Sequence, residues 1–159
     1  VFGLTNGTVP IVAYNFGARK GDRMKKTIQY SVYAAIAIMI CGALIFQSIP
    51  DKLLLLFDAS DEMLRLGVPA LRIISLGFPL AGFGIGAGSV FQALGYSVYS
   101  MVVSLIRQLV VLIPCAYVIG RVTGDVTGVW WAFFIAELVS LMVSALYLRR
   151  VNRNVIRTI

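Results

Sequence analysis

Long stretches without a charged residue constrain the fold of this chain more than any other feature. Residues 27–50 contain no Lys, Arg, Asp or Glu, and neither do residues 73–106. A helix needs about 20 apolar residues to cross a bilayer, so the first stretch suits one crossing. The second is too long for one crossing and is divided at Gly95, Tyr96 and Ser97. With 59% hydrophobic residues, 13% charged residues and a mean hydropathy of +0.88, the composition is typical of a membrane protein.

We predict an all-α membrane protein, a polytopic helical bundle with about five transmembrane segments. The predicted spans lie near residues 1–16, 27–49, 66–94, 97–120 and 126–148. The first is short and does not begin with methionine, so we expect it to be the later part of a helix whose beginning is missing.

Basic residues concentrate on one side of these spans. Nine lie in the connection at residues 17–26 and in the C-terminal tail: Arg19, Lys20, Arg23, Lys25, Lys26, Arg149, Arg150, Arg153 and Arg157. The other side has three, which lie beside acidic residues: Lys52, Arg65 and Arg121. Cytoplasmic loops are enriched in Lys and Arg, so we predict a multi-pass protein of the plasma or inner membrane with loop 17–26 and the tail in the cytoplasm. The net charge of +7 then reflects orientation, and we expect membrane lipid and not nucleic acid as a partner.

Enzyme chemistry finds little support in the residue types present. Histidine is absent, which excludes Ser-His and Cys-His catalysis and imidazole ligands for zinc or haem. Cys41 and Cys115 both lie within apolar runs, where a buried thiol is ordinary. We therefore predict no enzyme activity, no catalytic residue, no bound metal and no cofactor.

Proline and glycine fall inside the predicted spans. Glycines four residues apart let a neighbouring helix approach closely or let their own helix bend, and proline removes a backbone donor. We expect the span 66–94 to be the most deformable. The residues to which we assign bending or packing are Pro79, Gly82, Gly84, Gly86, Gly88 and Pro114.

Two charged residues lie near mid-depth of consecutive antiparallel spans. Arg107 is about 20 Å of helix from one end of its span, and Glu137 is about 15 Å from the start of the next. An arginine there costs about 2.5–3.5 kcal/mol on insertion scales, so it should face the bundle interior and find a partner. A coupling site for protons or substrate and a structural ion pair both fit, and we favour the structural pair. Four further polar residues are candidates for lining a cavity: Tyr14, Asn15, Gln92 and Gln108.

Several motifs, taken in order, resemble the second half of multidrug and toxin extrusion (MATE) transporters. They are residues 7–18 (GTVPIVAYNFGA) before a basic loop, residues 92–95 (QALG), Arg107 and Gln108 ahead of Pro114, and residues 128–132 (GVWWA) with Glu137. The resemblance covers essentially the whole chain. It implies twelve helices in two six-helix lobes, with residues 1–159 as a partial carboxy-terminal lobe, helices eight to twelve, and with the amino lobe absent.

The same resemblance implies a secondary active antiporter that exports organic cations, drugs or other xenobiotics in exchange for Na⁺ or H⁺ by alternating access. Its partners would be small cationic substrates and the missing amino-terminal lobe. Family members couple through an acidic residue of the amino lobe, and some add acids on helices seven and ten. Residues 66–94 contain no Asp or Glu, so we expect the coupling-ion site outside this chain.

Two alternatives remain open at this point. A lipid-linked oligosaccharide flippase of the same superfamily would show more cationic residues facing its cavity than Arg72 and Arg107 provide. A non-transporting membrane subunit that anchors or senses belongs to a different class, and a soluble domain elsewhere in the reading frame would favour it.

Overall fold

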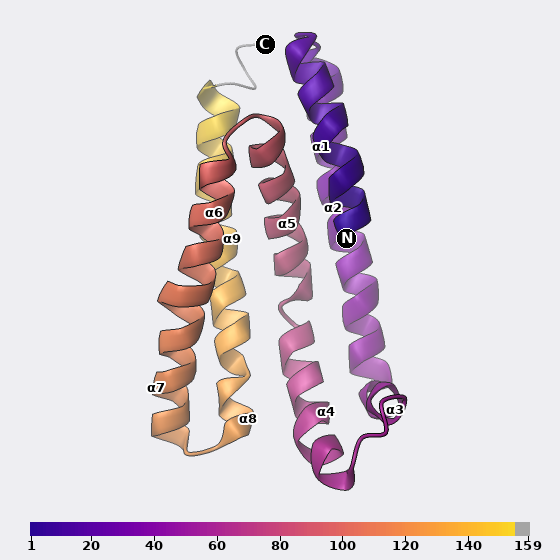
Figure 1. The fold of residues 1–159 in the computed structure, drawn as a ribbon, viewed down its shortest axis with the longest axis vertical. Helices are drawn as coiled ribbons and strands as arrows, with labels where there is room; N and C mark the ends of the chain where they lie inside the picture. The colour runs from indigo at the N-terminus through magenta and orange to yellow at the C-terminus, as the bar shows by residue number, and fades with distance from the viewer. Residues whose placement is uncertain (155–159) are drawn as a thin grey trace.

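The computed structural model describes residues 1–154, which form a bundle of helices running up and down beside one another (Figure 1). No strand occurs within that range. The helical segments are α1 (Phe2–Gly17), α2 (Gly21–Ser48), α3 (Pro50–Leu55), α4 (Asp61–Ser75), α5 (Phe78–Ala93), α6 (Ser97–Leu105), the π-helix η1 (Ile106–Leu112), α7 (Ile113–Thr123), α8 (Val126–Val129) and α9 (Trp131–Asn154).

Three stretches are long and apolar enough to cross a membrane, namely Gly21–Ser48, Ser97–Thr123 and Val126–Arg153. A fourth crossing results if α4 and α5, which meet at a bend of 52°, form one broken span. Helix α1 has 16 residues and covers about 24 Å, less than a full crossing. In Figure 1 it begins part-way along the bundle. The architecture is that of an all-α membrane protein.

The basic residues within 17–26 and 149–153 share one end of the bundle, where α1 ends, α2 begins and α9 finishes (Figure 1). The turn between α1 and α2 comprises only residues 18–20, with Arg19 at a positive φ of 55°. Three basic residues that we expected in a loop therefore lie on the first turns of α2, namely Arg23, Lys25 and Lys26. Charged residues at the membrane surface do not end a helix, because the helix continues to satisfy its own backbone hydrogen bonds there. Arg157 lies outside the described residues.

Helix α5 is the centre of the bundle and packs against α1, α2, α6 and α9. A Cβ atom added at Gly82 would lie 3.1 Å from the carbonyl oxygen of Ala35 in α2, and one at Gly86 would lie 3.0 Å from the Val32 Cγ2 atom. These two glycines, one turn apart, let the backbones of α5 and α2 approach closely.

The break in the predicted 66–94 span lies at Leu76 and Gly77, upstream of the glycines to which we assigned bending. Pro79 explains the position. It has no N–H to donate to the carbonyl four residues earlier, that of Ser75, and Ser75 is the last residue of α4. Gln47 of α2 compensates for backbone acceptors left at this end, since its Nε2 atom donates to the Arg72 carbonyl at 2.7 Å. Interhelical side chains commonly satisfy such groups in membranes.

Pro114 acts in the same way on the turn before it. The π-helix η1 ends at Leu112, and Pro114 is the second residue of α7. The N–H of Ile113 donates to the Gln108 carbonyl, five residues back, as in a π-turn. The widened turn accommodates a proline without the sharp bend seen at α4 and α5.

Candidate functional site

Arg107 and Glu137, which lie on neighbouring spans, meet in the structure. The Arg107 Nη1 atom donates a hydrogen bond to Glu137 Oε1 at 3.0 Å. Arg107 belongs to η1 and Glu137 to α9, so the pair joins the fourth and fifth predicted spans. It is the one ion pair found among residues 1–154. The geometry brings both charges together, and whether the pair serves packing or coupling stays a prediction.

The ion pair also touches the break between α4 and α5. A Cβ atom added at Gly77 would lie 3.2 Å from Cγ of Glu137. Glycine at this position therefore leaves room for the glutamate stem. Three parts of the fold meet at one point: the broken span, the π-helix and α9.

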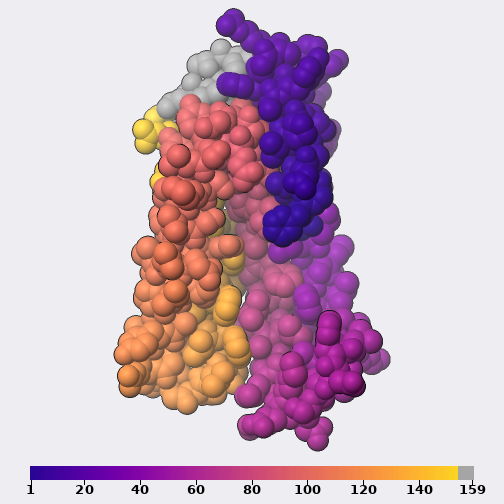
Figure 2. Space-filling view, viewed as in Figure 1, coloured from indigo at the N-terminus to yellow at the C-terminus, as the bar shows by residue number. Residues whose placement is uncertain are grey.

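A cleft of about 300 Å³ lies beside the ion pair and includes Arg107. Helices α1, α5, α6, η1 and α9 all contribute to its walls. The space-filling view shows the surface hollowed between the α1 side and the α6 side (Figure 2). Hydroxyl and amide groups dominate the polar lining, which consists of Thr5, Ser89, Gln92, Ser100, Ser104, Arg107, Ser140 and Ser144.

Glycines of α5 create the room for these hydroxyls. A Cβ atom at Gly88 would lie 3.3 Å from Ser100 Oγ, and one at Gly84 would lie 3.7 Å from Ser140 Oγ. Gly84 and Gly88 thus face the cleft, while Gly82 and Gly86 face α2. The Ser144 hydroxyl is buried and has no hydrogen-bond partner in the described residues.

The predicted cavity residues lie in different places. Gln92 lines the cleft. Asn15 is buried and its Nδ2 atom donates to the Ile11 carbonyl of its own helix at 2.8 Å. Tyr14 is 72% exposed, and Gln108 lies on the exposed side of η1. The cavity role of these four residues in a larger assembly stays a prediction.

The serines of the cleft are functional candidates that sequence reasoning missed. Each one alone is ordinary, because serine is common in membrane helices. Their spacing carries a signal: Ser100 and Ser104 are one turn apart on α6, and Ser140 and Ser144 are one turn apart on α9. Both pairs complement the glycine pair on α5. Three such pairs on successive spans could have located the cleft.

Comparison with known proteins decides the family. The MatE family model matches residues 1–118. The chain belongs to the MatE family. Among curated MatE relatives, the multidrug export protein MepA of Staphylococcus haemolyticus (strain JCSC1435) is 30% identical over 140 residues, which are 87% of this chain and 30% of that protein. MepA of Staphylococcus aureus (strain bovine RF122 / ET3-1) is 29% identical over 138 residues, 86% of this chain and 30% of that protein. The chain thus spans about 30% of the length of these relatives.

Solved structures of MATE transporters extend the match through α9. The MATE multidrug transporter DinF-BH, solved as a complex, is 34% identical, with a TM-score of 0.86, over 98% of this chain and 34% of that chain. An outward-facing MATE family transporter of the MOP superfamily gives a TM-score of 0.88 at 21% identity, over 99% of this chain and 35% of that chain. The second likeness shows the fold alone. The names of these relatives denote transporters or export proteins.

Proposed function

We propose that this chain forms part of a secondary active antiporter that exports drugs and other organic cations in exchange for Na⁺ or H⁺. The observation that carries the proposal is the 34% identity, over 98% of the chain, to DinF-BH, a MATE multidrug transporter. The chain covers 34% of DinF-BH, so it supplies one part of such a machine. The missing partner is an amino-terminal lobe of the same kind of polypeptide.

The cleft supports this function through its chemistry. Its hydroxyl and amide oxygens can accept hydrogen bonds from a cationic substrate, and the ion pair leaves Arg107 compensated by Glu137. Transporter sites commonly lie near the bilayer midplane beside discontinuous helices. Here the α4–α5 break and the π-helix η1 both border the ion pair.

Alternating access draws support from two fold likenesses. The chain matches an inward-facing MATE transporter with a TM-score of 0.84 and an outward-facing one with a TM-score of 0.88. The same unit therefore resembles both states, which is expected if lobes rock as rigid bodies. In this scheme the Arg107–Glu137 pair holds the unit together, and the coupling ion binds outside this chain.

We also propose the orientation and compartment. Eight basic residues of the described range lie at the end where α1 and α9 finish, against one carboxylate, Asp22. The positive-inside rule then assigns this end to the cytoplasm of a cell with the protein in its plasma or inner membrane.

Export of ethidium, a fluorescent organic cation, tests the proposal. The complete reading frame that encodes this chain is expressed in bacteria lacking their own drug exporters, and cellular accumulation of ethidium is measured. We expect accumulation to fall, and to rise again when the Na⁺ or the H⁺ gradient is collapsed separately, which identifies the coupling ion. Unchanged accumulation with the protein present in the membrane would refute export of such cations and favour an anchor or sensor subunit.

A size series at one glycine links export to the cleft. Gly84→Ala adds a Cβ at an ordinary contact distance, 3.7 Å from Ser140 Oγ, and should preserve export. Gly84→Leu fills the cleft and should abolish export at normal membrane yield. Equal export by both variants would show that substrate passes elsewhere.

A further inference from the structure

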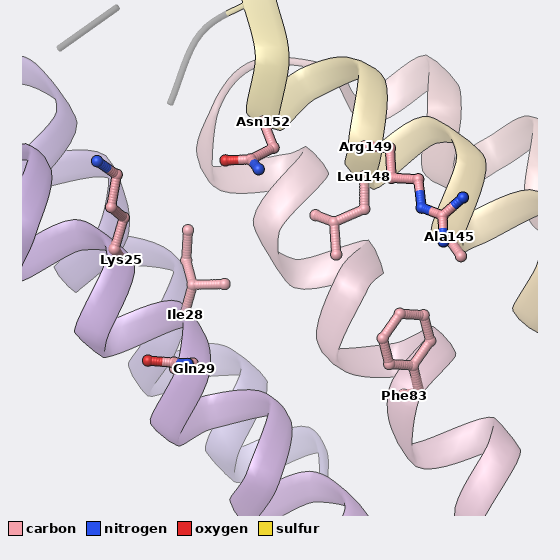
Figure 3. Close-up of a pocket in the computed structure, with 8 residues that line it drawn as sticks. All are labelled: Lys25, Ile28, Gln29, Phe83, Ala145, Leu148, Arg149 and Asn152. Atoms are coloured by element: carbon pink, nitrogen blue, oxygen red, sulfur yellow. The ribbon is translucent and has the colours of Figure 1, made fainter. Parts of the chain in front are cut away.

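A second groove, of about 600 Å³, lies between α2 and α9 and shares no lining residue with the serine cleft. Its residues recur at helical spacing along one face of each helix. Helix α2 contributes positions 25, 28 and 29, and α9 contributes positions 145, 148, 149 and 152. Phe83 of α5 forms the floor between them, as Figure 3 shows.

The groove changes character with depth. Lys25 and Asn152 lie at its outer end, where α2 begins and α9 finishes. In Figure 3 the Asn152 amide extends from α9 toward α2, and Lys25 extends along α2 toward the helix end. Ala145 lies about 10 Å from Asn152 along α9. The outer end is polar, and the apolar lining residues lie deeper, at Ile28, Phe83, Ala145 and Leu148.

The charge at the outer end is positive and uncompensated within the groove. Lys25 and Arg149 belong to opposite walls of the groove, and none of the lining residues is acidic. In Figure 3 the Arg149 guanidinium extends away from α2 and lies beside Ala145. Asp22 is the one carboxylate at this end of the described range, and it forms no ion pair there. Further basic residues lie at the same end of the bundle: Arg19, Lys20, Arg23, Lys26, Arg150 and Arg153.

We propose that this groove binds one anionic phospholipid. Its phosphate would lie at the outer end, where the flexible side chains of Lys25 and Arg149 can turn toward it from the two walls, and an acyl chain would lie on Ile28, Phe83 and Leu148. Basic pockets between transmembrane helices at the headgroup level bind acidic lipid headgroups. The amides of Gln29 and Asn152 supply donors for ester or glycerol oxygens. The apolar floor selects a lipid over a free anion, because only a lipid has an apolar chain to bury there.

Lipid binding to the complete protein, purified in detergent from the full reading frame that encodes this chain, tests this inference, with dioleoyl phosphatidylglycerol as the probe and dioleoyl phosphatidylcholine as the zwitterionic comparison. We expect native mass spectrometry to show one tightly bound phosphatidylglycerol and no phosphatidylcholine at equal concentration. Each cation near an anionic headgroup contributes about fivefold in affinity, so the double variant Lys25→Gln with Arg149→Gln should lose about 25-fold.

Matched variants separate the groove from general surface charge. Lys26→Gln with Arg150→Gln removes two positive charges at neighbouring positions outside the groove. Its affinity for phosphatidylglycerol should fall less than about fivefold. Lys25→Arg with Arg149→Lys keeps both charges and should keep binding, which shows that the two positive charges and not the native side chains hold the lipid. Equal loss in both Gln pairs would overturn the proposal.

Competition distinguishes lipid from free anion. Inorganic phosphate and glycerol 3-phosphate should fail to displace phosphatidylglycerol, because neither has an acyl chain. Displacement by either at concentrations comparable to the lipid would show an anion site and overturn the assignment. Binding of phosphatidylcholine as tight as phosphatidylglycerol would also overturn it.

Discussion

The ion pair between Arg107 and Glu137 makes a quantitative prediction about stability. Removing one partner of a fully buried pair costs about 3–5 kcal/mol. Here the side chains are 36% and 18% exposed, so the full figure does not apply. A hydrogen bond to a charged group contributes about 1.5–3 kcal/mol, and we expect a loss in this range for Arg107→Ala or for Glu137→Gln.

The double variant isolates the interaction itself. Polar contacts between membrane helices reach a coupling energy of about 1.7 kcal/mol in the strongest measured cases, and a 3.0 Å charged contact should come near this value. The double variant should therefore recover part of the summed loss. Unfolding in detergent, followed by circular dichroism, measures the stability of the native chain, the two single variants and the double variant.

Exposed charges elsewhere provide the control. Glu62→Gln and Arg65→Ala change exposed charges on α4 that form no ion pair, and their effects should stay within about 0.5 kcal/mol and add. Additive losses at Arg107 and Glu137 would show that the contact contributes nothing. If Glu137→Gln folds normally in the complete transporter but loses ion-driven export, the coupling role replaces the structural one.

The topology and the packing lead to three more expectations. In a background without the native cysteines, a cysteine at Lys20 or Asn152 should be protected from an impermeant thiol reagent in intact cells, and one at Ser60 should be labelled. Labelling at Lys20 would reverse the proposed orientation. Gly82→Ala should destabilise the chain by about 1–3 kcal/mol in detergent unfolding, because its Cβ would meet the α2 backbone at 3.1 Å. Gly84→Ala, two residues along, should cost less than Gly82→Ala, and equal effects would contradict the assigned packing faces. Expressed by themselves, the 159 residues should not lower ethidium accumulation, since they span about 30% of their relatives' length. Lowered accumulation would show that the chain suffices for export.

The position of the charges predicted the fold class because charge is costly in hydrocarbon. The same rule placed the Arg107–Glu137 contact, since two mid-depth charges on adjacent spans have few other partners. The positions of the charges were less informative about where helices begin. Helix α4 starts at Asp61, outside the predicted 66–94 span, because the Ser60 hydroxyl accepts a hydrogen bond from the N–H of Met63 and caps it.

Backbone irregularities were harder to place than spans. The prolines were visible, but a missing N–H acts on the carbonyl four residues earlier, so the breaks precede the prolines. Whether the helix then bends or widens depends on neighbours that are distant in sequence. At α4 the donor is Gln47, 25 residues from Arg72. No local pattern reveals that contact.

The break between α4 and α5 and the π-helix η1 both lie at the Arg107–Glu137 ion pair. Gly77 lies in the break caused by Pro79 and packs against Glu137, while Arg107 belongs to the π-helix that precedes Pro114. A shift of η1 would move Arg107 relative to Glu137, and a shift at the break would change the packing against the Glu137 stem. Because the Arg107 side chain also lines the serine cleft, such a shift would change the shape of the cleft. Under the function proposed above, a pair that stabilises the unit would therefore also influence the shape of the cleft.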